Sequence, residues 1–226
     1  MLSCDQNIAS LNRPNDIARD FLTGASTEPN SRSYRPSVSV IFVNYKRCHD
    51  TLLRCKKVIS ALFDFRLDLI VIDNSPYSYF GCFAEQLDEL DTGSRHSVQV
   101  LHNKKNCRFR AYNIGLNLAH KDFIFFRSDD DDFDETIVRE YLLTHQNKRA
   151  DHITAFEYFY EDTRQRKRSA RRPIETIALP NSPRLSSFRV PEKASGDWLF
   201  LQQLKEQFCW KFSDLVVMRK VRHGRN

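Results

Sequence analysis

The chain has 226 residues, of which 41% are hydrophobic and 12% aromatic, and it carries a formal net charge of +6. This length suits one sizeable α/β domain with a small appendage better than two full domains. The mean hydropathy of −0.55, with apolar runs far shorter than the roughly 18 residues of a membrane span, predicts a soluble globular protein. A pI of about 9.0 favours an anionic partner such as a nucleotide diphosphate, an anionic lipid headgroup or a nucleic acid.

Two further features bear on where the protein works. The N-terminus lacks a basic region followed by an apolar core and a small-residue cleavage site, so we expect no secretory signal and a cytoplasmic location. The six cysteines lie at wide intervals without a C-x-x-C motif. This spacing argues against a zinc knuckle or a disulfide framework and predicts reduced, mostly structural thiols.

The chain divides into an extension and one domain. Residues 1–35 are rich in Asn, Ser, Arg and Pro, which predicts a mobile or loosely docked N-terminal extension. From residue 36 the chain alternates between strand and helix patterns. We therefore expect a single domain over 36–226.

The alternation predicts a mainly parallel, Rossmann-like α/β sheet flanked by helices and joined by right-handed crossovers. Apolar β-branched runs and helical spacing predict strands at 38–43, 67–72, 98–101 and 123–128, and helices at 50–62, 80–90 and 110–119, the first of them capped by Asp50. Beyond these we expect a helix at 134–145, a strand at 151–160, a helix at 198–208 and an apolar segment at 215–218. A loop or lid at 163–193 holds nine Lys or Arg and two Glu.

Polar side chains follow each of the first four predicted strands. Asn44, Asp73, Asn103 with Asn106, and Asp129–Asp132 stand at these strand ends. In open parallel sheets the ligand binds beyond the carboxyl ends of the strands, so these groups should converge on one rim. Four adjacent carboxylates repel one another, which predicts a cation at this rim.

Four segments in register on this pattern carry a resemblance to a known family. They are VSVIFVNY at 38–45, IVIDNS at 70–75, Asn106 with NIGL at 113–116, and SDDDD at 128–132. They resemble the successive signatures of GT-A fold glycosyltransferases, and most closely the inverting family 2. The similarity covers 36–140 and resumes more weakly from residue 196. It implies nucleotide-sugar binding by 36–140, acceptor binding and catalysis by 141–226, and transfer to an acceptor hydroxyl with inversion.

The resemblance implies a divalent cation, Mg²⁺ or Mn²⁺, bound by the acid-x-acid pair Asp129 and Asp131, whose side chains share a side if strand geometry persists. Asp130 with Asp132 is an equally spaced alternative. Asp129 and Asp130 are also expected to contact the donor. His223 matches a late family histidine that approaches the metal or diphosphate, although a terminal histidine is often simply exposed.

The same resemblance gives Val43 and Asn44 contacts to the nucleoside and Asp73 a contact to the base. A carboxylate accepts from uracil N3–H, so a uridine nucleotide is favoured, and an Asx-turn that closes the strand is the alternative for Asp73. Asn106 and Asn113 fall on the pattern Asn-x-Gly-x-x-x-x-Asn-x-Gly as donor-binding residues. Arg108 replaces the first glycine, so its side chain should point away from the donor or towards phosphate.

Inverting transfer needs a base that accepts the proton of the acceptor hydroxyl. Asp197 is the acid at the matching place, with helix N-capping as its alternative role. Trp198 and Trp210 could stack on an acceptor sugar, but aromatic residues of this kind more often belong to the core.

Two other functions compete with glycosyl transfer. A sugar-phosphate nucleotidyltransferase would be expected to carry a Gly-rich phosphate loop after the first strand, and 44–50 has none. A non-catalytic anion or nucleic-acid binder could use the basic segment 163–193, but adjacent acids suit it poorly. We therefore expect a nucleotide sugar, a UDP-sugar by preference, as donor and a glycan or lipid-linked glycan as acceptor. The basic flank favours peripheral association with the inner face of a membrane.

Overall fold

The computed structural model describes residues 35–90, 95–145, 152–160, 166–167, 172–188 and 196–220. Nearly all of the predicted extension, most of the basic run within 163–193, and the tail that contains His223 lie outside these ranges. Among the described residues, no helix combines the length and apolarity needed to cross a bilayer.

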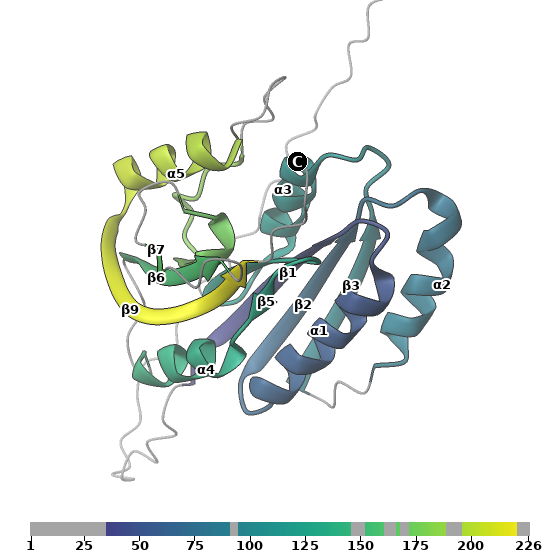
Figure 1. The fold of residues 1–226 in the computed structure, drawn as a ribbon, viewed down its shortest axis with the longest axis horizontal. Helices are drawn as coiled ribbons and strands as arrows, with labels where there is room; N and C mark the ends of the chain where they lie inside the picture. Colours follow the sequence, from purple (N-terminus) through teal and green to yellow (C-terminus); the bar gives the residue numbers. More distant parts are fainter. Residues whose placement is uncertain are drawn as a thin grey trace, which may run out of the picture. The chain divides into compact units, whose positions relative to one another are not determined.

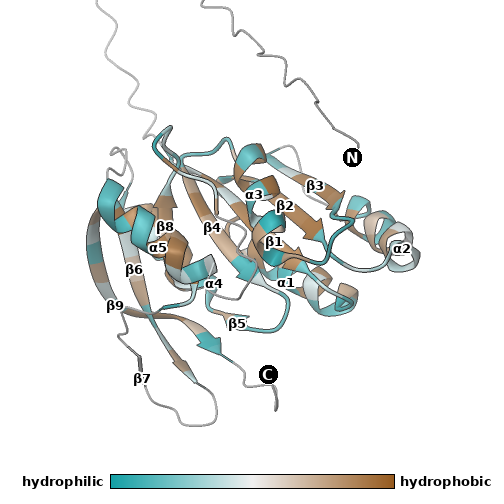
Figure 2. Ribbon diagram, turned by 90° about the horizontal axis from the view of Figure 1, so that it is seen from above, coloured by the Kyte–Doolittle hydropathy of each residue, from teal (hydrophilic) through white to brown (hydrophobic). Residues whose placement is uncertain are grey.

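The first four strands form the parallel core that the sequence predicts. They are β1 (Ser37–Asn44), β2 (Arg66–Asp73), β3 (His96–His102) and β4 (Phe123–Ser128). Their order in the sheet is β3-β2-β1-β4, and each neighbouring pair is parallel. Figure 1 shows β1, β2 and β3 side by side with helices packed against them, and Figure 2 also labels β4 next to β1.

The later strands of the described ranges extend the sheet beyond β4. They are β5 (Asp132–Phe133), β6 (His152–Tyr160), β7 (Arg166–Lys167), β8 (Ile177–Pro180) and β9 (Cys209–Lys220). The order continues β4-β8-β6-β9-β5, with β7 paired to β6. Because β8 is antiparallel to both β4 and β6 while β9 is parallel to β6, the sheet is mixed on this side.

The helices occupy the stretches expected of them, within a few residues at each end. They are α1 (Cys48–Ala61), α2 (Tyr77–Asp88), α3 (Arg108–Leu118), α4 (Glu135–Thr144) and α5 (Gly196–Gln207), with a 3₁₀ turn, η2, at Ile174–Thr176. The prediction that Asp50 caps the first helix is wrong. The cap position is Arg47, because α1 begins two residues before the predicted start and Asp50 lies in its first turn.

The two faces of the sheet are covered by different helices. Side chains alternate along β1, so Val40 and Phe42 face a core shared with α1, α2 and α4, whereas Ile41 and Val43 face a core shared with α3 and α5. Figure 2 shows the resulting brown strands inside helices that are partly teal. Burial on both faces explains why the predicted strands are nearly continuous apolar runs.

Gly115 is required for the packing of α3 on the sheet. A Cβ atom there would collide with Cγ2 of Ile41 and lie 3.1 Å from its Cγ1 and Cδ1 atoms. The Asn-x-Gly motif at 113–115 therefore contains a glycine that lets the helix approach β1 closely.

We expect Gly115→Ala to lower the free energy of unfolding by about 1–3 kcal/mol, the usual cost of overpacking a core. The matched control is Gly81→Ala in α2, where an added Cβ meets nothing within 4 Å. Because alanine is the better helix former, this control should be neutral or stabilising by up to about 1 kcal/mol. Denaturant unfolding of both variants measures the difference, and equal effects at the two positions would contradict the packing role.

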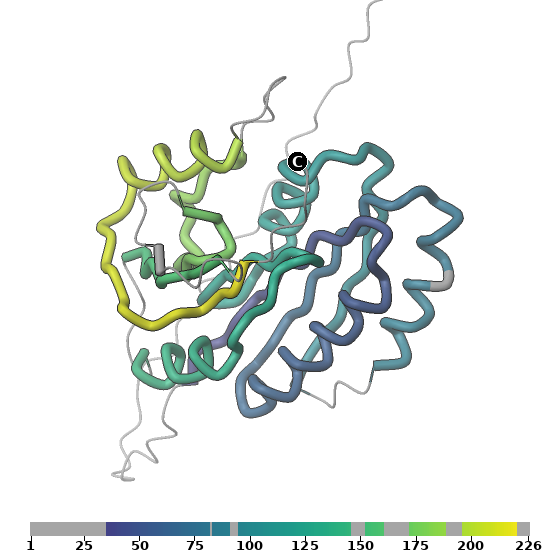
Figure 3. Tube along the Cα trace, in the orientation of Figure 1, coloured from purple at the N-terminus to yellow at the C-terminus, as the bar shows by residue number. Residues whose placement is uncertain are grey.

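Strand β9 is much longer than the apolar segment predicted at 215–218. Many side chains in its first half are exposed, such as Phe212. This half therefore has no continuous apolar run from which a buried strand could be predicted. Figures 1 and 3 show it in yellow, curling from the end of α5 towards β5. Register shifts interrupt its pairing with β6, and Arg219 finally pairs with Asp132. The curl brings Lys220, at the end of β9, to the acids that follow β4.

Candidate active site

The polar ends of the parallel strands meet at one rim, as the sequence predicts. Asn44 lies opposite Asp73 in the β1–β2 register, Asp73 lies opposite His102, and Val43 lies opposite Ser128. Backbone hydrogen bonds continue this alignment past the strand ends, because Asn103 N–H donates to the Asp73 carbonyl at 2.8 Å. The carboxyl edge of the sheet is therefore a continuous line of polar groups.

One oxygen of the Asp73 carboxylate accepts three hydrogen bonds, and the other accepts none. Oδ1 of this fully buried carboxylate accepts from Asn44 Nδ2 at 2.8 Å, from Ser75 N–H at 3.0 Å and from Ser75 Oγ at 2.6 Å. The bond from Ser75 N–H is the Asx-turn that the sequence offered as an alternative. Oδ2 is buried without a hydrogen-bond partner, so it can accept one bond from a ligand.

The side chain of Asn44 forms hydrogen bonds with other protein groups. Its Nδ2 donates to Asp73, and its Oδ1 accepts from Thr51 Oγ1 at 2.9 Å. The structure thus gives Asn44 a positioning role, and the expected direct contact between this side chain and a nucleoside stays a prediction. Val43, beside it on β1, is buried.

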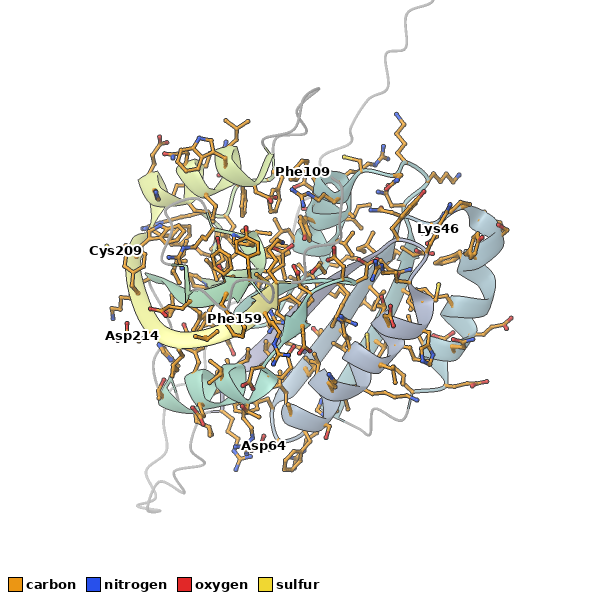
Figure 4. The ribbon with its side chains drawn as sticks, in the orientation of Figure 1. Lys46, Asp64, Phe109, Phe159, Cys209 and Asp214 are labelled. Carbon is orange, nitrogen blue, oxygen red and sulfur yellow. The ribbon has the colours of Figure 1, made fainter. Side chains whose placement is uncertain are left out.

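Ser75 and Lys46 were not singled out from the sequence. Ser75 Oγ accepts from the Lys46 backbone N–H at 2.7 Å, and Lys46 adopts a left-handed backbone with φ of 60°. Such a conformation is uncommon for a residue other than glycine and is often found at ligand sites. Figure 4 labels Lys46 beside the start of α1. The loop that follows β1 is therefore held in one shape by the end of β2.

The four acids diverge as they leave the sheet. The expectation that Asp129 and Asp131 continue strand geometry is wrong, because β4 ends at Ser128. Asp129 Oδ2 accepts from the Tyr45 backbone N–H at 2.7 Å, whereas Asp131 Oδ2 lies 3.1 Å from Lys220 Nζ and 3.2 Å from Ser128 Oγ.

Asp132, from the alternative pair, lies in β5 and forms an ion pair with Lys57 at 3.6 Å. Asp131 is the most buried acid of the run, at 1% exposure, and it pairs with Lys220 at 3.1 Å. Each candidate pair therefore contains one acid bound to a lysine, and the choice of Asp129 with Asp131 stays a prediction.

The charged forms of Asp129 and Asp131 are poorly stabilised in the protein alone. Burial raises the pKa of Asp129 to about 6, with Asp130 adding to the rise and the Tyr45 N–H opposing it. Burial also raises the pKa of Asp131, although Lys220 works in the other direction. Hard oxygen ligands with this unmet charge fit a divalent cation. Among the described residues, no group of three His, Cys, Asp or Glu side chains is placed to hold a metal ion. A cation bound by Asp129 and Asp131 would therefore also need oxygen atoms from a bound substrate molecule.

We expect Asp129→Asn to change how stability depends on pH. A folded-state pKa of about 6, above the ordinary value near 4, means that the folded protein binds this proton more tightly than the unfolded chain. The contribution of Asp129 to the free energy of unfolding therefore falls as pH rises from about 4 to about 6, and it stays low at higher pH. The melting temperature of the variant relative to the wild type, without metal, should rise over this interval. A difference that stays constant with pH would contradict the elevated pKa.

A cavity of about 590 Å³ lies next to Lys220, the residue that contacts Asp131. It is lined by Arg108, Tyr158, Tyr160, Arg172, Pro173, Glu175, Asp197, Trp198, Leu201 and Lys220. Lys220 joins the two regions, because it lines the cavity and also contacts Asp131. Trp198, for which a place in the core was the favoured prediction, lines the cavity instead.

Asp197 enters the cavity from the first turn of α5. The helix begins at Gly196, where a Cβ would lie 2.5 Å from Cζ of Phe109, so glycine allows α5 to start directly against α3. Figure 4 labels Phe109 on α3 near α5. This contact places Asp197 Oδ2 at 2.8 Å from Nη2 of Arg108. Arg108, expected to point away or towards phosphate, instead binds the candidate base.

The second oxygen of Asp197, Oδ1, is buried and has no hydrogen-bond partner. The carboxylate accepts from Arg108, and no bond to a helix N–H is found among the described residues, which disfavours N-capping as its role. Burial raises the pKa of Asp197, with Arg108 and then Lys220 opposing the rise. A carboxylate with a raised pKa is a better general base than an ordinary aspartate.

Glu175 is a second acid of the cavity, and it was missed from the sequence. It is 5% exposed, and its Oε1 accepts from the Tyr112 hydroxyl at 2.7 Å. Burial raises its pKa, and the nearby Asp197 raises it further. The residue lies in a proline-rich stretch with no periodic pattern, so only its isolated charge there could have drawn notice.

The two asparagines of the predicted loop motif have different surroundings. Asn106 is exposed in the loop between β3 and α3. Asn113 donates to the Phe188 carbonyl at 2.9 Å and accepts from the Phe188 N–H at 2.7 Å. Asn113 therefore binds the segment around Phe188 to α3, and the donor contacts expected of Asn106 and Asn113 stay predictions.

A mainly parallel sheet with polar groups and acids at the carboxyl edge of its first four strands fits a GT-A fold glycosyltransferase. The family model described as Glycosyl transferase family 2 matches residues 39–209. The chain belongs to this family, which confirms the resemblance found in the sequence. No curated protein sequence matches the chain.

Solved structures of TarS from S. aureus share the fold. A crystal structure of TarS 1-349 matches with a TM-score of 0.63 and 14% identity, covering 82% of this chain and 60% of that one. TarS 1-349 in complex with UDP-GlcNAc matches with a TM-score of 0.63 and 13% identity, covering 84% of this chain and 60% of that one. The complex of TarS 1-349 with UDP matches with a TM-score of 0.63 and 14% identity, covering 82% of this chain and 60% of that one. The chain thus spans about 60% of the length of these TarS structures.

Proposed function

We propose that the protein transfers a sugar from a UDP-sugar to a hydroxyl group of a glycan acceptor, with inversion at the anomeric carbon. The observation that carries this proposal is Oδ2 of Asp73, a buried acceptor without a hydrogen-bond partner on a carboxylate that is held in place at the rim. Uracil N3–H is a donor of matching polarity. The UDP and UDP-GlcNAc complexes of TarS, which shares the fold, support a uridine nucleotide.

In this mechanism Asp197 is the catalytic base. Its open Oδ1 takes the proton of the acceptor hydroxyl while the hydroxyl oxygen bonds to the anomeric carbon. The bond from that carbon to the diphosphate oxygen breaks, and UDP leaves with the electron pair. Arg108 keeps the carboxylate oriented through its 2.8 Å contact. Lys220 contributes positive charge between this cavity and the acids.

Asp129 and Asp131, with His223 from the tail, are proposed to hold Mn²⁺ or Mg²⁺, and Asp130 to contact the donor. When bound, the ion would neutralise charge that develops on the leaving diphosphate. The family favours sugar transfer over the nucleotidyltransferase and the non-catalytic binder. A lipid-linked acceptor and attachment to a membrane surface are also part of the proposal, and they rest on the family together with the net charge of +6.

The proposal is tested by thermal stabilisation with UDP, with and without Mn²⁺, together with UDP release from a panel of UDP-sugars. We expect a metal-dependent rise in melting temperature and release of UDP from at least one sugar. Absence of both would overturn the proposed function.

We expect Asp73→Asn to weaken UDP binding by about 10- to 100-fold, the value of a hydrogen bond to a charged group. Three donors converge on the position of Oδ1, so they will hold the amide oxygen there and place the NH₂ group where Oδ2 was. A donor then faces uracil N3–H, whereas cytosine N3 is an acceptor. The variant should therefore bind CDP better than UDP, as calorimetry can measure.

The matched control is Asp68→Asn, at the other end of the same strand. Asp68 is also buried and accepts from Ser97 Oγ at 2.6 Å, so its loss perturbs β2 without touching the rim. Its UDP affinity should match that of the wild type. An equal loss in both variants, with no gain for CDP, would show that Asp73 only stabilises the strand.

A further inference from the structure

Arg172 is a buried cation that lines the cavity beside Asp197. It is 6% exposed, and its Nη1 donates to the Phe156 carbonyl at 2.8 Å while its guanidinium lies 5.2 Å from the centre of the Phe212 ring. A guanidinium has five N–H donors. Within the described part of the chain, no carboxylate forms an ion pair with it.

The other cations of the same cavity are neutralised. Arg108 pairs with Asp197 at 2.8 Å, and Lys220 pairs with Asp131 at 3.1 Å. Arg127, also buried, is held by both oxygens of Glu135 at 2.8 and 2.7 Å. Arg172 thus lacks, within the described residues, the ion pair that Arg108, Lys220 and Arg127 each form.

The pKa directions agree with this difference. Burial lowers the pKa of Arg172, and the opposing effects of Tyr158 and Glu157 do not overcome it. For Arg108 burial acts in the same direction, but Asp197 and further negative groups outweigh it and raise the pKa. A buried charge without a partner costs free energy, and a ligand that brings the opposite charge recovers it.

The remaining lining suits a sugar ring. Tyr158, Tyr160 and Trp198 present aromatic side chains with polar tips, and about 590 Å³ falls within the usual size of a small-molecule site. Asp197, the candidate base, lines the same cavity. A ligand in this cavity would therefore be placed as the acceptor of the transfer reaction.

We infer that the acceptor carries an anionic oxygen group, a carboxylate or a phosphate, which the guanidinium of Arg172 binds in this cavity. The inference rests on the proposed function, since it assigns the acceptor class of the same site. Arg172 would discriminate charged from neutral acceptors, and Asp197 would act on a hydroxyl of the bound sugar.

The test compares three ligands that differ at one carbon: methyl β-glucoside, methyl β-glucuronide and methyl β-glucoside 6-phosphate. Their affinities are measured by ligand-observed NMR on the wild type with UDP and Mn²⁺ present. We expect at least one charged ligand to bind ten or more times more tightly than the neutral one. The glucuronide and the 6-phosphate separate the two anion types.

Arg172→Met should remove that preference and leave the affinity for methyl β-glucoside unchanged, and Arg172→Lys should retain part of it. Arg184→Met, at an exposed position, should behave as the wild type. If Arg172→Met does not fold, the ligand series on the wild type and on Arg172→Lys still decides. Equal binding of the three ligands, no binding of any of them, or an equal loss for all in the variant would overturn the inference.

UDP affinity, measured in the same samples, keeps the two proposals apart. Wild-type protein that binds UDP but does not distinguish the ligands refutes only the acceptor inference. Wild-type protein that fails to bind UDP refutes the proposed function itself.

Discussion

Asp197→Asn should lower the rate of sugar transfer by about 10²- to 10⁴-fold, the usual contribution of a general base, and leave UDP affinity nearly unchanged. The amide keeps the shape of the side chain and cannot accept the proton of the acceptor hydroxyl. In the proposed function UDP binds at the strand ends around Asp73, which belong to β2 and not to α5, so the affinity for the nucleotide should not depend on Asp197. Initial rates with the active UDP-sugar and calorimetry with UDP measure the two effects.

Arg108→Gln is the matched control, because it breaks the same ion pair and keeps the carboxylate. The side chain of Arg108 is 55% exposed, so the pair itself contributes little to stability. If Asp197 is the base, Arg108→Gln should retain much more transfer activity than Asp197→Asn. Equal activity in the two variants, or loss of UDP affinity in both, would mean that the ion pair matters for structure and that the base lies elsewhere.

The part of the fold that could be predicted from the sequence is the part in which runs of apolar residues correspond to buried strands. The runs that became β1, β2 and β4 are apolar throughout because helices cover both faces of these strands. The polar residues directly after them marked the rim, since parallel strands bring their carboxyl ends together. The amino-acid pattern alone is therefore enough to place Asp73 and the acids after β4 at this rim.

The contacts of the candidate site were harder to predict because they join distant segments. Lys220 reaches Asp131 across 89 positions of the chain, through a curled strand whose pairing shifts register. Arg108 and Asp197 are likewise 89 positions apart. No local periodicity encodes such contacts, and Glu175 lies in a stretch without any regular pattern.

Arg127 was not singled out from the sequence. It is a charged residue near the end of an apolar strand, and its side chain is fully buried. Its Nε and Nη2 atoms bind Glu135 in α4, and its Nη1 donates to the Phe126 carbonyl at 2.8 Å. The guanidinium also lies 4.4 Å from the centre of the Phe133 ring. Arg127 thereby fixes the end of β4 to the start of α4, on either side of the acids.

Removal of either partner of this pair should be among the most destabilising single changes in the protein. Arg127→Met leaves the Glu135 carboxylate buried without its cation, and Glu135→Gln leaves the guanidinium without its anion. Each should lower the free energy of unfolding by about 3–5 kcal/mol, the cost of an uncompensated buried charge. Denaturant unfolding at neutral pH measures the loss.

The double variant Arg127→Met/Glu135→Leu decides whether the pair or the individual charges matter. With both charges gone, nothing is left unpaired, so the double variant should recover most of the stability lost in either single variant. Arg139→Met is the control for a less buried ion pair, because that side chain is 34% exposed and binds Asp64 at 2.7 Å; its cost should stay near or below about 1 kcal/mol. If the double variant were as unstable as the sum of the single ones, each side chain would contribute through packing of its own, and the account of Arg127 as a charge that depends on Glu135 would fail.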